Sequence, residues 1–69
     1  MEESVYRVIE VIGTSPTSWE EAARMAVETA GTTLEDLRVA EIVELDMRLQ
    51  DNKVMAYRAK VKISFKYRI

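Results

Sequence analysis

The sequence predicts an α+β fold of β-α-β-β order, in which one helix packs on a three-stranded antiparallel sheet. Three observations predict it. Residues 4–12 are rich in β-branched and aromatic types, which favours a strand. Apolar residues from Trp19 to Leu34 recur at the three- and four-residue spacing of a helix, and apolar residues in 37–50 and 54–69 alternate with charged ones. We expect residues 1–69 to form one domain of a single helix layer on a single sheet.

The first strand is predicted over residues 4–12, followed by a turn over 13–18 that contains Gly13 and Pro16. Two helix starts compete within this turn. Ser15 followed by Pro16 fits an N-cap with proline at the first helical position. Ser18 with Glu21 fits a capping box. We favour Ser18 as the cap of the main helix, with a turn beginning at Ser15.

The helix is predicted to run to about Thr33, and Gly31 weakens its last turn and can mark its end. Its apolar face is mostly alanine, which would let the helix lie close to a sheet. The members of this face are Trp19, Ala22, Ala23, Ala26, Val27, Ala30 and Leu34.

The two long strands are predicted to form a hairpin around a three-residue loop, 51–53, because this register matches both apolar faces and opposite charges. It places Gln50 opposite Val54 and Asn52 or Lys53 in the left-handed conformation. The expected pairs are Leu45 with Ala59, Val43 with Val61, Val39 with Phe65, Asp46 with Arg58, and Glu44 with Lys60. The first strand is predicted to pair with the third strand.

Composition excludes several classes of site. The 69 residues include no Cys and no His, so a disulfide scaffold, a thiolate zinc site and the triads that use His are excluded within one chain. The net charge of -2 argues against a nucleic-acid partner. No apolar stretch approaches the roughly 20 residues of a membrane span, and the acidic start is unlike a signal peptide. A cytoplasmic protein is the expectation.

A chain of this size is expected to assemble with copies of itself. Below roughly 70–80 residues, one core rarely supplies more than about 3–5 kcal/mol without disulfides, metal or oligomerisation. One alanine-rich helix also cannot cover two long strands that each carry an apolar face. We therefore expect a homo-oligomer.

The layout, with Gly13-Thr14-Ser15 between the first strand and the helix, resembles the dodecin family. The resemblance covers essentially the whole chain, including residues 6–15 and residues 57–65. It implies that twelve copies of the chain assemble into a hollow homododecamer. It also implies a small ligand-binding or storage protein that has no catalytic residues. Most dodecins bind paired flavins, which stack on a Trp in the second strand and contact a Gln in the third.

This sequence departs from the flavin pattern, because the matching positions are Val39 and Arg58. Loss of the aromatic platform removes on the order of 1–3 kcal/mol per stacked ring, by analogy with base stacking. The turn Gly13–Glu20 and the segment Glu44-Leu45-Asp46-Met47 are similar to a calcium-binding branch of the family. The resemblance therefore implies binding of divalent cations, calcium first, with flavin as the alternative ligand.

Glu44 and Asp46 are the candidate metal ligands, because alternate strand residues point to one side and carboxylate oxygens suit hard cations. Glu20 is a further candidate. The family's second carboxylate at this place matches Thr17, which is a departure. A rival interpretation remains open, in which Asp46 and Glu44 only form ion pairs with Arg58 and Lys60.

Three other features have two interpretations each. Trp19 would line a ligand pocket or, more commonly, fix the start of the helix to the sheet or fill a subunit contact. Glu41 interrupts the apolar face of residues 37–49; it is either part of an acid-base pair or, as we favour, at a sheet edge or subunit contact. The basic row Lys60, Lys62, Lys66 and Arg68 resembles a nucleic-acid stripe, but it lacks interleaved exposed aromatics and fits a solvated or intersubunit face better.

Overall fold

The computed structural model describes residues 3–67. Its elements are β1 (Tyr6–Ser15), α1 (Trp19–Ala30), β2 (Leu37–Gln50) and β3 (Lys53–Lys66). The three strands form one antiparallel sheet in the order β1-β3-β2. The predicted β-α-β-β order and the pairing of the first strand with the third are confirmed. Residues 68–69, which the sequence assigned to the third strand, lie outside the described residues. No helix within residues 3–67 is long and apolar enough to cross a membrane.

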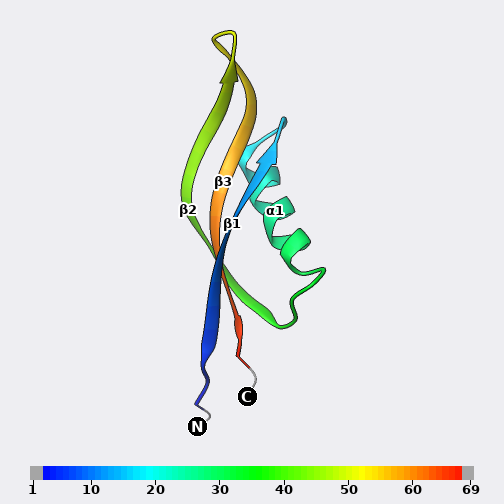
Figure 1. Cartoon of the computed structure of the whole chain (residues 1–69), viewed down its shortest axis with the longest axis vertical. Coiled ribbons are helices and arrows are strands. Elements are labelled where there is room, and N and C mark those ends of the chain that lie inside the picture. Colours follow the sequence, from blue (N-terminus) through cyan, green and yellow to red (C-terminus); the bar gives the residue numbers. More distant parts are fainter. Residues whose placement is uncertain (1–2, 68–69) are drawn as a thin grey trace.

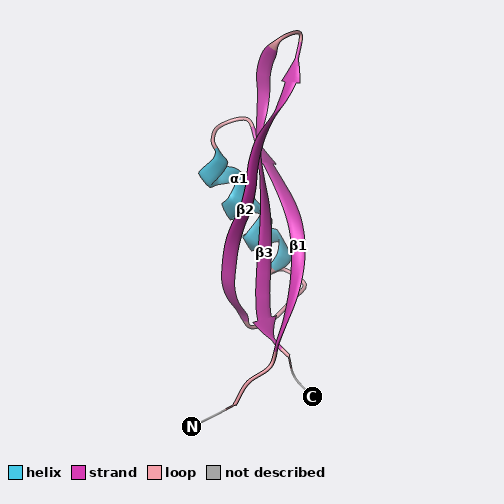
Figure 2. Cartoon of the chain, turned by 90° about the vertical axis from the view of Figure 1, so that its left-hand side faces the viewer, coloured by secondary structure: helices cyan, strands magenta, loops and turns pink. Residues whose placement is uncertain are grey.

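The helix covers only part of one face of the sheet (Figures 1 and 2). It packs on β1 and β3 and barely touches β2. The core beneath it is small and consists of Ala22, Ala26, Ala59, Val61 and Ile63. The β2–β3 hairpin extends well past the helix, and the molecule measures 53 × 20 × 15 Å. A large share of the apolar residues on the strands is therefore left uncovered in a single chain.

The first strand continues three residues beyond the predicted end, through Gly13, Thr14 and Ser15. Gly13 lies opposite Ala59 in β3 and directly beneath the helix. A Cβ atom at Gly13 would lie 2.1 Å from the backbone oxygen of Ala22 and 2.9 Å from the Cβ of Ala26. The missing side chain at Gly13 permits the helix to approach the strand closely. Gly13 therefore serves the packing of the helix from within β1, and does not mark the end of the strand.

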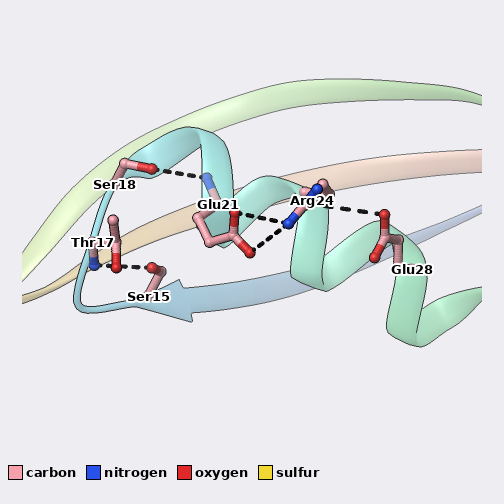
Figure 3. A network of polar contacts seen from close by, with 6 residues as sticks. All are labelled: Ser15, Thr17, Ser18, Glu21, Arg24 and Glu28. Atoms are coloured by element: carbon pink, nitrogen blue, oxygen red, sulfur yellow. Dashed lines mark hydrogen bonds and ion pairs between the residues drawn. The ribbon is translucent and has the colours of Figure 1, made fainter.

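Ser18 caps the helix, as predicted, and its hydroxyl accepts a 3.0 Å hydrogen bond from the backbone N–H of Glu21 (Figure 3). The expected turn at Ser15 is also present, because the Ser15 hydroxyl accepts the N–H of Thr17 at 3.0 Å. The helix ends at Ala30 with Gly31 as its C-cap, so the end suggested by Gly31 is confirmed and the predicted end near Thr33 is wrong.

The predicted hairpin loop is wrong, although the register beyond it is largely right. Gln50 pairs with Lys53 around a two-residue turn, in which both Asp51 and Asn52 have positive φ (53° and 63°). A bulge then leaves Met55 unpaired between the partners of Leu49 and Arg48. That extra residue restores the register that the matching of faces and charges requires, so a shorter turn and a bulge replace the longer loop.

Two further irregularities in β2 change which residues face the helix. Register shifts occur between Leu37 and Val39 and between Ile42 and Glu44. Val61 therefore pairs with Ile42 in place of Val43, and Phe65 pairs with Leu37 in place of Val39. The predicted pairs Leu45–Ala59, Asp46–Arg58 and Glu44–Lys60 are confirmed.

Candidate functional site

Asp46 and Arg58 form a two-point ion pair across β2 and β3. Arg58 Nε donates to Asp46 Oδ1 at 2.7 Å, and Arg58 Nη2 donates to Asp46 Oδ2 at 3.1 Å. The two side chains are 45% and 40% exposed, respectively. Bidentate pairing fixes the plane of the carboxylate as well as its position.

This pairing stabilises the charged form of the carboxylate. The hydrogen bonds from Arg58 hold the pKa of Asp46 below its ordinary value, against a smaller opposing effect of burial. The nearby charges of Arg58 and Lys60 lower it further. Asp46 is thus an anion at neutral pH whose charge is largely matched within the chain.

Glu44 is held far more loosely. Its Oε1 lies 3.5 Å from Lys60 Nζ, and its side chain is 60% exposed. No hydrogen bond accompanies this ion pair, so Glu44 presents carboxylate oxygens to solvent on the same strand as Asp46. Because Glu44 and Asp46 alternate with Leu45, both side chains lie on the sheet face opposite the one that Leu45 occupies.

Glu20 lies on the other side of the sheet from these two carboxylates. With Trp19, Ala23, Ile42 and Leu45 it lines an open groove of about 320 Å³ between the start of the helix and the uncovered part of β2. The sequence therefore placed Glu44 and Asp46 together correctly. The chain does not bring Glu20 to them.

Within residues 3–67, no three Asp, Glu, His or Cys side chains are placed to hold one metal ion. Calcium takes 6–8 oxygen ligands, and two carboxylates cannot supply them alone. The donor chemistry of Glu44 and Asp46 nevertheless fits a hard cation, since both offer exposed carboxylate oxygens on one face. A complete site would need oxygens from water, from backbone carbonyls or from a second copy of the chain.

Trp19 fixes the start of the helix to the strand that carries the two carboxylates. Its indole Nε1 donates a 2.9 Å hydrogen bond to the backbone oxygen of Asp46. Its ring meets Tyr57 edge to face, with centroids 5.1 Å apart and planes at 71°. This confirms the structural role favoured from the sequence, and the specific acceptor was not foreseen.

The two positions at which the sequence predicts a departure from the flavin pattern carry no aromatic ring and no amide. Val39 is 63% exposed and presents no aromatic face, and Arg58 is engaged with Asp46. Thr17 lies in the turn before the helix, and its N–H donates to the Ser15 hydroxyl (Figure 3).

Glu41 lies on the charged face of the sheet, so its predicted place on the apolar face is wrong. The register shift after Ile42 reverses the faces of β2, and Glu41 becomes the partner of Lys62, which also pairs with Glu10 in β1. Its expected place at a sheet edge is confirmed, because β2 is an outer strand. The charged residue within an apolar alternation was itself the sign of the bulge.

The sequence and the fold of this chain both match known proteins. The Dodecin family model matches residues 5–68. Calcium dodecin from Mycobacterium tuberculosis is 51% identical over 65 residues, which cover 94% of this chain and 92% of that protein.

Solved structures show the same fold. The crystal structure of that calcium dodecin, described as a calcium-chelating antigen with a novel calcium-binding site, matches with a TM-score of 0.85 over 94% of this chain and 93% of its own. Dodecin from Streptomyces coelicolor is 33% identical and matches with a TM-score of 0.93 over 100% of this chain and 99% of its own. The chain belongs to the dodecin family.

Proposed function

We propose that this protein is a calcium-binding storage protein, which forms a hollow homododecamer and holds divalent cations at Glu44 and Asp46. The observation that carries the proposal is the pair of exposed carboxylates on one face of β2, in a chain 51% identical to a calcium dodecin. The protein acts in binding and not in catalysis.

Assembly is supported by the apolar surface that one chain leaves uncovered. Val39, Leu49, Val8 and Ile12 are 63%, 62%, 59% and 51% exposed, and the groove beside Trp19 is open. Apolar surface of this extent is typical of an interface, and closed symmetry is the usual way to bury it. Light scattering should give a mass near twelve times that of the 7.9 kDa chain. A folded species with the mass of one chain would contradict assembly.

Assembly would also complete the ion site. In the proposal, water, backbone carbonyls and a neighbouring copy supply the oxygens that Glu44 and Asp46 lack. Glu20 contributes only from such a neighbour, because within its own chain it lies on the opposite side of the sheet from Glu44 and Asp46. An ion that binds only the assembled protein stabilises the assembly by mass action.

Melting curves with and without calcium test the proposal. Calcium should raise the melting temperature of the native protein, and Asp46→Asn or Glu44→Gln should abolish that gain. Glu28→Gln is the matched control, because Glu28 is an exposed carboxylate on the helix whose nearest partner, Arg24, is 4.0 Å away. A melting temperature that calcium leaves unchanged, or a gain that survives Asp46→Asn, would overturn the proposed site.

A further inference from the structure

Asp46 has no oxygen without a partner within its own chain. Both carboxylate oxygens accept hydrogen bonds from Arg58, and the backbone oxygen accepts the indole N–H of Trp19. Each carboxylate oxygen retains a further lone pair, so its geometry still permits a metal bond. The obstacle is electrostatic, since a full positive charge already lies against the group that a cation would use.

Glu44 provides an internal comparison. Its one partner, Lys60, is 3.5 Å away, makes no hydrogen bond to it, and carries its charge on a flexible stem. The guanidinium at Asp46 is planar and matches the carboxylate at two points, so less entropy is lost in holding it there. Of the two carboxylates, Glu44 is accessible to an ion, whereas the Asp46 carboxylate is already paired with the Arg58 guanidinium.

We propose that Arg58 sets the calcium affinity of this site by competing with the ion for the Asp46 carboxylate. The inference rests on the proposed function. In the ion-free chain, Arg58 neutralises Asp46 and keeps the two neighbouring carboxylates of β2 from repelling one another. When calcium binds, the ion takes over that neutralising role and the Asp46–Arg58 contact opens. Arg58 is thus a positioning residue that weakens ion binding.

The test measures calcium affinity by titration calorimetry on the assembled protein, with Trp19 fluorescence as a second readout. Trp19 is the only tryptophan of the chain and is hydrogen-bonded to Asp46, so it reports on this site. Removing the positive charge that is bonded to the Asp46 carboxylate should strengthen binding on the order of tenfold in Arg58→Gln. Arg58→Lys keeps the charge but loses the two-point fit, and its affinity should lie between the two.

Two controls separate competition from a general effect of charge. Arg48→Gln removes an equal charge two residues along β2, on the same face as Asp46, but the Asp46 carboxylate accepts its hydrogen bonds from Arg58 and not from Arg48, so this variant should gain less affinity than Arg58→Gln. In an Asp46→Asn background calcium binding is already lost, and Arg58→Gln should not restore it, because the competed carboxylate is absent.

Each outcome supports or contradicts either the role of Arg58 or calcium binding itself. Unchanged or weaker binding in Arg58→Gln, with binding intact in the native protein, would overturn the role of Arg58 and leave the proposed function standing. A gain in Arg48→Gln equal to that in Arg58→Gln would overturn competition in favour of a general charge effect. Absence of calcium binding in the native protein and in every variant would overturn the proposed function and this inference together.

Discussion

The indole N–H of Trp19, the first residue of α1, donates to the backbone oxygen of Asp46, 27 positions further along the chain. The same ring contacts Tyr57, the neighbour of Arg58 on β3. One side chain thus connects the helix to both strands at the point where the Asp46–Arg58 pair forms. The packing of the helix and the placement of the candidate ion ligands depend on the same residue.

Trp19→Phe should weaken the fold while keeping an aromatic ring beside Tyr57. The variant leaves the backbone oxygen of Asp46 without its donor, which costs about 1 kcal/mol. Trp19→Ala also removes the ring contact and should cost about 2–3 kcal/mol. Denaturant unfolding followed by circular dichroism checks the order native, Phe, Ala. Equal stability of the native and Phe proteins would show that the hydrogen bond contributes nothing.

Gly13→Ala should be strongly destabilising, because the new Cβ would lie 2.1 Å from the backbone oxygen of Ala22. Helix and strand would have to separate, and overpacking of this kind costs about 1–3 kcal/mol. Gly31→Ala is the matched control, because the nearest atom would be 3.4 Å away and φ is already -68°. The control should melt at or slightly above the native temperature, and a Gly13→Ala protein as stable as this control would contradict the close packing.

Acid should remove the stabilisation that the Asp46–Arg58 pair provides. The pKa of Asp46 is lowered in the folded chain, chiefly by hydrogen bonds from Arg58, so the contribution is fully present above the unfolded pKa of about 3.9. It is lost as the pH falls from there through the lower folded pKa. Melting temperatures between pH 6 and pH 2, without calcium, should fall more steeply for the native protein than for Asp46→Asn. Parallel curves would show that the pair does not contribute.

Flavin should bind weakly at most. Val39 gives the ring no platform, and Arg58 cannot accept the hydrogen bonds that a Gln carbonyl can. Titration with riboflavin should therefore quench little of its fluorescence. Val39→Trp should restore part of the affinity, and Val39→Trp with Arg58→Gln should restore more. Strong quenching by the native protein would indicate another aromatic platform, such as Trp19 or Tyr57.

Much of the fold follows from the sequence because periodicity and charge matching act locally. The order of elements, the Ser18 cap and the Asp46–Arg58 and Glu44–Lys60 pairs were all predicted. The bulge at Met55 was not, because an unpaired residue there leaves the local pattern almost unchanged. The bulge after Ile42 did leave a sign, the charged Glu41 within the apolar alternation, but that sign was attributed to a sheet edge or subunit contact. The true end of β1 was missed for a different reason: Gly13 is needed by the helix packed above it, and nothing local shows that.

The candidate site was predictable in part. Alternation along β2 placed Glu44 and Asp46 on one face, since the period of a strand is 2. The separation of Glu20 from them follows from the same alternation, since the helix covers the apolar face of the sheet and the two carboxylates lie on its charged face. The acceptor of the Trp19 indole is a backbone atom, which no side-chain pattern can reveal.

The most direct test of calcium binding is a count of the ions in the assembled protein. The purified protein should be equilibrated with calcium and excess magnesium, dialysed and analysed for its elements, beside Asp46→Asn prepared in the same way. We expect calcium in fixed proportion to the chain in the native protein and its loss in the variant. The account would be contradicted if the native protein retained no calcium, or if Asp46→Asn retained as much calcium per chain as the native protein.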